Sequence, residues 1–230
     1  MTSRNFKAQL NRQTVAEQLI TSLRHAIISG ELAEGEILTE SALSKQLGTS
    51  RSPVREAIQQ LRRERLITPG PNRMMIVTSL NVKDVDELYE YRIALEKTSI
   101  AKLCRQNEPD RSSVAHQLEN ALLEIKAALE NGDIYLISSA DFSFHEVLVT
   151  SAGNGRISEA YRALSAEFLT LINRLEMSFP SGEELIDDHY ELVDAIRSGE
   201  PLRGVSLIEN HLKSAASRLR TRFKTTEQEI

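Results

Sequence analysis

The chain has 230 residues, of which 40% are hydrophobic, so it can form real cores and suits one large or two modest domains. Its single cysteine, Cys104, excludes an intramolecular disulfide framework and is typical of a protein in a reducing compartment. No segment approaches the roughly 18 consecutive apolar residues of a membrane span, and the N-terminus lacks the apolar core of a signal peptide. We therefore expect a soluble, cytoplasmic protein with no membrane partner.

The net charge of −5 is divided unevenly along the chain. Residues 1–78 contain 11 Lys or Arg and 7 Asp or Glu, a balance of +4, whereas residues 79–230 contain 17 and 26, a balance of −9. A local positive field suits contact with a polyanion, and the acidic remainder does not. Together with the short polar linker at 78–81, this change predicts two domains, residues 10–78 and residues 82–223.

The first predicted element is a helix over residues 15–29, in which apolar residues recur every four positions. Residues 39–65 then predict two short helices joined by a tight turn. Leu43 and Leu47 form an apolar stripe on the first of them, and Gly48 suits the left-handed position that ends a helix. Ser50 or Ser52 can cap the second helix, whose first turn accommodates a proline at position 53.

The second of these helices has a buried face and a basic entrance. Val54, Ala57, Ile58 and Leu61 predict the buried face, so the arginines point elsewhere. This layout is typical of a helix-turn-helix, whose second helix inserts its N-terminal end into the DNA major groove. The residues placed to meet phosphates and guanine edges are Thr49, Ser50, Arg51, Ser52 and Arg55. The alternative is an amphipathic helix pair with a solvated basic face.

Two short apolar segments, residues 66–68 and 74–77, flank a turn rich in proline, glycine and asparagine and predict a β-hairpin. A hairpin directly after a recognition helix is a wing. Asn72 and Arg73 at its tip are candidates for contact with the minor groove or the DNA backbone, although Gly70 and Asn72 are equally well explained as turn residues.

Residues 47–57, with the sequence Leu-Gly-Thr-Ser-Arg-Ser-Pro-Val-Arg-Glu-Ala, carry a specific resemblance. The region from Thr39 to Val77 resembles the winged helix-turn-helix of GntR-type bacterial transcription regulators. It departs from their pattern at Arg65, where a glycine usually ends the recognition helix, and in a wing with fewer glycines. The resemblance implies binding to double-stranded DNA at a palindromic operator, as a homodimer.

The remainder of the chain has helical periodicity throughout. Stop and start signals delimit about six amphipathic helices, near residues 82–105, 109–131, 133–152, 154–177, 183–197 and 201–222. Short connections between them imply an antiparallel bundle. The predicted fold class is therefore mainly α, with an N-terminal winged helix-turn-helix (three helices plus a small β-hairpin) followed by an all-α bundle.

Four residues of metal-ligand type interrupt apolar stripes in this bundle: Asp141, His145, His189 and His211. Burying them without partners is costly, and a divalent metal would satisfy them together. Three imidazoles and a carboxylate suit Zn²⁺, Ni²⁺, Mn²⁺ or Fe²⁺, with zinc favoured. The alternative is that each histidine is a hydrogen-bonded core residue and that Asp141 pairs with one of them. His25 and His116 have polar helical neighbours, so we expect both at the surface.

Arg92 lies between Leu88 and Leu95 on the inward stripe of the first bundle helix, with Glu96 four residues on. A buried guanidinium is either ion-paired within the chain or available to an anionic ligand. The sequence leaves these two readings open.

The bundle is similar to the FCD ligand-binding domain that follows many GntR-type winged helices, those of the FadR-like branch. The matching segments are residues 91–96, 141–145 and 151–154, with His189 and His211. The resemblance implies a divalent metal held by the four ligand-type residues. It also implies a small organic-acid or sugar-acid effector, which completes the coordination of the metal and meets Arg92; Asn154 is a further candidate contact.

We therefore expect a transcription regulator that is not an enzyme, most simply a repressor that a small carboxylate-type effector controls. Two alternatives remain. Three histidines and an aspartate with an open coordination position could activate water in a metal-dependent hydrolase. No second Glu or His on an apolar face is clearly placed as its general base, however. The other alternative is a DNA-binding protein with a purely structural metal and no effector.

Overall fold

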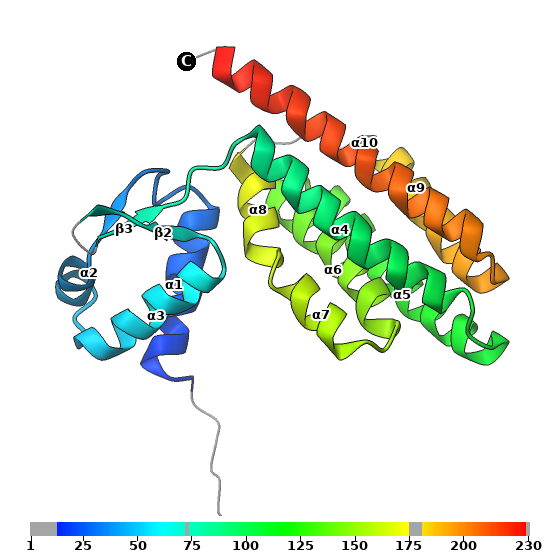
Figure 1. Ribbon diagram of the computed structural model, residues 1–230, viewed down its shortest axis with the longest axis horizontal. Coiled ribbons are helices and arrows are strands. Elements are labelled where there is room, and N and C mark those ends of the chain that lie inside the picture. Colours follow the sequence, from blue (N-terminus) through cyan, green and yellow to red (C-terminus); the bar gives the residue numbers. More distant parts are fainter. Residues whose placement is uncertain (1–12, 72–73, 175–180, 229–230) are drawn as a thin grey trace, which may run out of the picture. The chain divides into compact units, whose positions relative to one another are not determined.

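The computed structural model describes residues 13–71, 74–174 and 181–228 (Figure 1). The chain divides into two compact units at Thr78–Ser79, except that residues 28–30 group with the second unit. The fold is mainly α, as predicted, with a small sheet in the first unit. Among the described helices, none is both long enough and apolar enough to cross a membrane.

The first unit begins with α1 (Val15–Ile28), which a capping box starts. The backbone N–H of Glu17 donates to Thr14 Oγ1 (3.1 Å), and the Glu17 carboxylate accepts from the backbone N–H of Thr14 (2.7 Å). Leu19, Leu23 and Ile27, spaced by four, form the buried face of the helix. The apolar period of the sequence therefore determines which face of α1 packs inward.

The helix-turn-helix consists of α2 (Glu40–Gln46) and α3 (Arg51–Arg63). Gly48 has φ +61°, the left-handed conformation predicted for the turn. Two details differ from the prediction. Leu47 is 41% exposed because it is the residue at which α2 ends, so the apolar stripe stops at Leu43. Ser50 is the N-cap residue of α3, but its hydroxyl makes no capping hydrogen bond within the described chain.

The predicted hairpin is present as β2 (Ile67–Pro69) and β3 (Met75–Val77), paired antiparallel. A further strand, β1 (Ile37–Leu38), pairs with the other edge of β3 and gives the order β1-β3-β2. The sequence did not predict β1 because two residues carry no periodicity. Asn72 and Arg73, the candidate contacts of the wing tip, lie outside the described residues.

The departure at Arg65 has a structural explanation. α3 ends at Arg63 with Glu64 as its C-cap residue, and Arg65 has φ +58°, a left-handed conformation that favours glycine. The chain therefore makes the same turn after the recognition helix that a glycine would make, with an arginine in the strained position.

The second unit is helical throughout its described residues (Figure 1). Its elements are α4 (Val82–Leu103), α5 (Glu108–Asn131), α6 (Ile134–Ser151), α7 (Gly155–Arg162), α8 (Ser165–Arg174), α9 (Gly182–Ser198) and α10 (Pro201–Gln228). In Figure 1, α4 and α10 lie side by side and run in opposite directions, and α5 packs against α6 and α9. Caps recognisable in the sequence set several boundaries: Asn81 begins α4, Gly132 ends α5 and Asp133 begins α6.

The predicted helix over residues 154–177 is wrong in one respect, because the chain breaks at Ala163–Leu164 into α7 and α8. Tyr161, Leu164 and Phe168 keep a helical spacing across the break and are all buried. No glycine or proline occurs at this position. The local sequence pattern is therefore the same for two helices separated by a turn and for one continuous helix. Packing in the tertiary structure determines the break.

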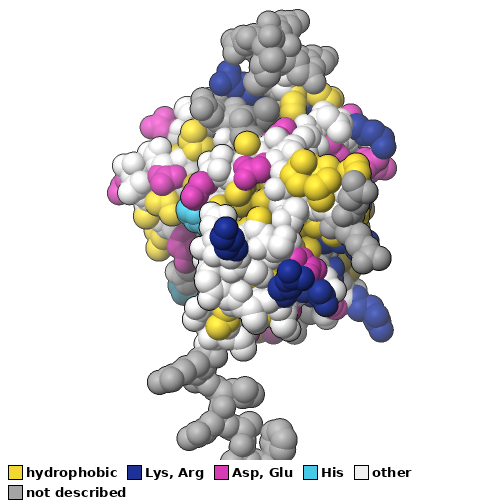
Figure 2. All heavy atoms as spheres, turned by 90° about the vertical axis from the view of Figure 1, so that its left-hand side faces the viewer, with side chains coloured by type: hydrophobic (Ala, Val, Ile, Leu, Met, Phe, Trp, Pro, Cys, Tyr) yellow, Lys and Arg dark blue, Asp and Glu magenta, His cyan; other side chains and the backbone are white. Residues whose placement is uncertain are grey.

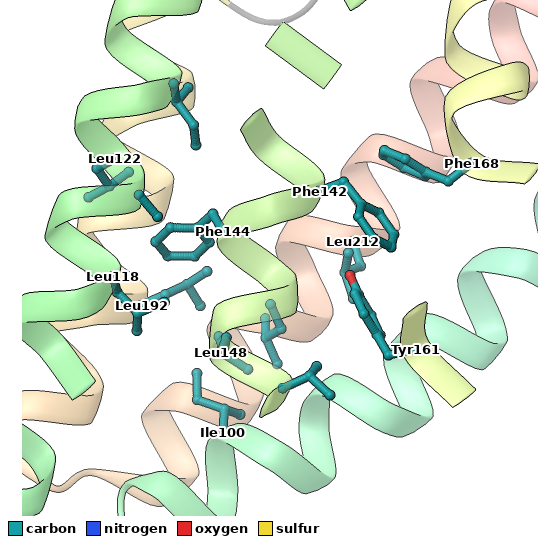
Figure 3. Close-up of a cluster of buried hydrophobic side chains, with 14 of the residues drawn as sticks. Ile100, Leu118, Leu122, Phe142, Phe144, Leu148, Tyr161, Phe168, Leu192 and Leu212 are labelled. Atoms are coloured by element: carbon teal, nitrogen blue, oxygen red, sulfur yellow. The ribbon is translucent and has the colours of Figure 1, made fainter. Parts of the chain in front are cut away.

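The core of the second unit has α6 near its centre (Figure 3). Phe144 extends from α6 toward Leu118 and Leu122 of α5, and Phe142 extends from the other side. The ring of Phe142 stacks on Tyr161 of α7 with 5.1 Å between centroids. Because α6 is enclosed in this way, its polar residues Asp141 and His145 are buried as well.

Candidate metal centre and nucleic-acid interface

The candidate DNA contacts lie at the start of α3. Ser50, Arg51, Ser52 and Arg55 are exposed, and Thr49 is half-buried. Because the hydroxyl of Ser50 does not cap the helix in the described structure, both this hydroxyl and the first-turn N–H groups of α3 are available to a phosphate. On the face drawn in Figure 2, several Lys and Arg side chains protrude from the surface, some of them beside Asp or Glu side chains.

Arg55 already has a partner on the neighbouring helix. Its Nε and Nη2 donate to the two carboxylate oxygens of Glu40 at 3.0 and 3.1 Å. Glu40 is the first residue of α2, fifteen positions earlier in the chain. The sequence did not predict this pair, because the distance between two residues on different helices follows from helix packing and not from spacing along the chain.

The four ligand-type residues of the second unit converge from three helices. Asp141 and His145 come from α6, His189 from α9 and His211 from α10. One ligand atom from each lies within 4.8 Å of all the others, and each residue is at most 8% exposed. The sequence predicted the faces on which these residues lie, and the structure shows that those faces meet.

The ring orientation of His189 is fixed by its own helix. Its Nδ1 is 2.7 Å from the backbone oxygen of Leu185, which can only accept, so Nδ1 carries the proton and donates. In the neutral ring Nε2 then presents a lone pair. This atom is 3.2 Å from Asp141 Oδ1 but has no hydrogen-bond partner in the described structure. A lone pair on the His189 nitrogen and the carboxylate oxygen repel each other at this distance, and a cation bound to both atoms removes the repulsion.

His145 is held in the same tautomer by a buried carboxylate. Its Nδ1 donates to Glu96 Oε2 at 2.6 Å, while its Nε2 is buried and has no partner among the described residues. Burial alone raises the pKa of Glu96, but His145 and Arg92 outweigh this effect, so the pKa of Glu96 is lowered. The ionised carboxylate makes His145 a better ligand, as carboxylates behind metal-bound histidines do.

His211 is neutral at physiological pH. Burial, opposed in part by Asp188, lowers the pKa of His211 to about 4. Its Nδ1 is buried and 3.5 Å from Asp188 Oδ2. The pKa of Asp141 lies below its usual range, because its contact with His189 and the neighbouring imidazoles outweigh the effect of burial. A neutral His211 and an ionised Asp141 are the protonation states in which these two groups bind a metal.

The donor set fits a divalent metal. In a tetrahedral site, metal–ligand bonds of about 2.0–2.2 Å place the ligand atoms about 3.3–3.6 Å apart, so an ion would draw the most widely separated of these atoms together by about 1 Å. The unpartnered ring nitrogens of His145 and His189 are what an ion would satisfy. His145, His189, His211 and Asp141 would hold it, and the three nitrogens with one oxygen suit zinc.

Arg92 belongs to the buried network behind the cluster. It is 1% exposed, its Nε donates to Glu96 Oε1 at 3.0 Å, and its guanidinium lies over the ring of Phe168 at 4.5 Å. The hydroxyl of Tyr161 donates to the same oxygen of Glu96 at 2.9 Å. Arg92 Nη2 is nevertheless buried without a hydrogen-bond partner in the described chain. Both readings of Arg92 therefore apply: it is ion-paired, and one donor is left over.

Other polar residues lie elsewhere. Asn154 is exposed, and its side-chain oxygen accepts from the backbone N–H groups of Arg156 and Ile157, so it caps α7. Its contact with an effector stays a prediction. His25 and His116 are exposed, as expected. The sequence analysis named Glu96 only as a partner for Arg92, and the roles of Tyr161 and Asp188 required the structure.

Both units match families of known proteins. The family described as "Bacterial regulatory proteins, gntR family" matches residues 15–75, and the FCD domain family matches residues 87–214. The "Probable D-xylose utilization operon transcriptional repressor" of Paenarthrobacter nicotinovorans is 29% identical over 204 residues, which cover 89% of this chain and 88% of that protein. The "Gluconate operon transcriptional repressor" of Bacillus licheniformis is 29% identical over 195 residues, covering 82% and 78%.

The solved structure of a transcriptional regulator GntR from Rhodococcus sp. RHA1 has the same fold, with a TM-score of 0.73 at 24% identity over 89% of this chain and 96% of that chain. The two units and their order thus agree with those of known regulators. The chain belongs to the GntR family of bacterial transcription regulators and carries an FCD domain behind its winged helix-turn-helix.

Proposed function

We propose that this transcription regulator binds a two-fold symmetric DNA operator through α3. We further propose that a small carboxylate-type effector, bound at a metal site in the helical unit, controls its operator affinity. The observation that carries the proposal is the cluster of four buried ligand atoms within 4.8 Å, in which two imidazole nitrogens lack hydrogen-bond partners among the described residues. A purely structural core would leave these atoms unsatisfied at a cost.

The metal is tested directly. Protein purified without chelator is analysed by inductively coupled plasma mass spectrometry, and metal-free protein is titrated with Zn²⁺, Ni²⁺, Mn²⁺ and Fe²⁺ by calorimetry. We expect one divalent ion per chain, with zinc favoured, and loss of binding in Asp141→Asn. His116→Ala, which removes an exposed histidine of the same unit, is the control. Absence of metal even after reconstitution refutes the site.

The charges around the cluster favour an anionic effector. Arg92 carries a positive charge, and Glu96 and Asp141 carry negative charges, so a divalent ion would give the set formed by these three residues and the ion a net charge of +1. A carboxylate bound to the metal balances this charge, and Arg92 has an unused donor. Two relatives named above regulate operons for D-xylose and gluconate, which makes sugar acids a natural part of the screen.

The effector is tested by thermal shift and operator binding against a panel of organic and sugar acids. A ligand of the folded protein raises its melting temperature, and an effector also changes DNA affinity, since it binds one arrangement of the protein better than the other. We expect a decrease in DNA affinity, as for a repressor released by its effector. A response that persists in Asp141→Asn argues against the metal-containing site, and no response to any acid favours a structural metal.

A homodimer fits a two-fold operator, since protein and DNA symmetry match. The surface that supports it lies between α5 and α6, where Leu123 is 58% and Leu136 is 42% exposed. A groove of about 390 Å³ lies in the same area, lined by small residues including Ala127 and Ala140. Sedimentation of Leu123→Glu tests this surface. We expect dissociation into monomers, whereas the same change at Leu202, 85% exposed on α10, should not alter the mass.

A further inference from the structure

The two arginines at the start of α3 differ although they lie one turn apart. Arg51 is exposed and makes no hydrogen bond with any described residue, although its charge is near enough to Glu40 to help lower the pKa of that carboxylate. Arg55 is also exposed, with 61% of its side chain accessible, but both Nε and Nη2 are held by Glu40. An exposed ion pair contributes little to stability, so the consequence of this contact lies in the geometry that it imposes.

A guanidinium has five N–H donors in a rigid fork and offers two usable edges. Glu40 takes the edge formed by Nε and Nη2. The other edge, formed by Nη1 and the second N–H of Nη2, donates to no described residue of the protein. We call these two terminal donors, on Nη1 and Nη2, the end-on fork. Their spacing matches the O6 and N7 acceptors of a guanine, the commonest bidentate contact of arginine in the major groove.

We propose that Glu40 is a positioning residue for DNA specificity: it holds one edge of the Arg55 guanidinium so that only the end-on fork is presented to a base. The inference rests on the proposed DNA-reading function. It assigns the two arginines different tasks, with Arg51 suited to a phosphate and the held Arg55 suited to a base edge.

Two further features support the assignment. Glu40 is itself held in place, because it is the first residue of α2 and the preceding Thr39 caps that helix through a hydrogen bond from Ala42 N to Thr39 Oγ1 (3.2 Å). Its carboxylate also repels a phosphate that approaches Arg55, which favours the uncharged base edge. The hydrogen bond with Arg55, more than any other contact, lowers the pKa of Glu40, so the carboxylate is ionised at neutral pH.

The experiment uses the full-length protein and begins with selection from random DNA duplexes, which yields the sequence preference of the wild type. The same selection is then made with Arg55→Ala, Glu40→Gln, Glu40→Asp and Glu56→Gln. Glu56→Gln is the matched control, because it removes the same charge from an exposed position of α3 whose side chain forms no hydrogen bond or ion pair with Arg55 in the described structure. Affinities for the selected duplex and for single-base variants are measured by fluorescence anisotropy, and circular dichroism confirms folding.

We expect Arg55→Ala to lose discrimination at one base pair of each half-site. Glu40→Gln should reduce discrimination at the same pair by about 10-fold, the order of one bidentate contact. Glu56→Gln should raise affinity for all sequences alike, as loss of a negative charge does, without loss of discrimination. Glu40→Asp, too short to reach both nitrogens, should behave like Glu40→Gln although its charge is unchanged.

Discrimination that is the same in Glu40→Gln and Glu56→Gln overturns the proposal, as does retention of every base preference in Arg55→Ala. Failure of the wild type to select any sequence has a different meaning, because it refutes the DNA-reading function itself. The two failures are therefore distinguishable.

Discussion

Two of the arginine–glutamate pairs of this protein, one from each unit, have opposite environments. In the first unit Arg55 and Glu40 are 61% and 36% exposed, whereas in the second Arg92 and Glu96 are 1% and 0% exposed. Water can replace either partner of the exposed pair, so that pair directs a side chain without stabilising the fold much. The buried pair must be complete, because a lone charge in the core is costly. The first unit thus presents its pair to solvent, and the helical unit encloses its own.

Among the substitutions that test this comparison, Glu96→Gln should have the largest effect on the free energy of unfolding. The amide leaves the charge of Arg92 buried without a counter-ion and cannot accept from both Arg92 and His145 as the carboxylate does. Loss of one partner of a buried pair costs about 3–5 kcal/mol in the free energy of unfolding. Urea denaturation followed by circular dichroism measures it. Glu40→Gln is the matched control and should leave the unfolding free energy unchanged within error; equal effects of the two substitutions contradict the comparison.

Withdrawal of metal should destabilise the helical unit and spare the winged helix. A ligand at 1,000 times its dissociation constant stabilises the folded state by about 4 kcal/mol. We therefore expect chelator to lower the free energy of unfolding of the wild type by about this amount and to have no effect on Asp141→Asn. Hydrogen exchange measured with and without chelator shows where protection is lost. Loss confined to residues 13–71 is the result that this account does not allow.

Acid should destabilise the helical unit even without metal. The pKa of His211 is about 4 in the folded protein, compared with about 6.5 for an unperturbed histidine, so the unfolded state binds more protons between these values. Stability is therefore full above pH 6.5 and decreases as pH falls toward 4, by about 3 kcal/mol in total. Denaturation of chelated protein from pH 7.5 to 4.5 measures the slope. His211→Gln should flatten the profile, and an unchanged slope in that variant removes His211 as its cause.

Arg65→Gly should have the smallest effect, in the exposed unit. The left-handed conformation at φ +58° is strained for arginine and relaxed for glycine, but glycine also gains more freedom in the unfolded chain. We expect a net stabilisation below about 1 kcal/mol, measured as a small rise in the melting temperature. Gly48→Ala provides the converse, because it places a Cβ at φ +61° and should destabilise. A marked loss of stability in Arg65→Gly shows that contacts of the arginine outweigh its strain.

Prediction from sequence succeeded where the signal is local. The helix-turn-helix follows from the apolar spacing of Val54, Ile58 and Leu61 and from the glycine at position 48. Prediction failed where packing against other elements determines the local structure. An example is the break between α7 and α8, where the helical spacing of apolar residues continues across the turn. The strand β1 was not predicted, because its two residues form a strand only through their pairing with β3.

The candidate site divides in the same way. Polar residues on apolar stripes identified Asp141, His145, His189 and His211, because the period of a helix determines which residues share a face. The sequence by itself therefore determined the fold class, the order of the units and the residues that face inward. Only the tertiary structure decided that three of those faces meet, that Glu96 connects His145 to Arg92, and that Glu40 holds Arg55. The physical reason is that spacing along a helix fixes direction, whereas distance between helices depends on how their side chains pack.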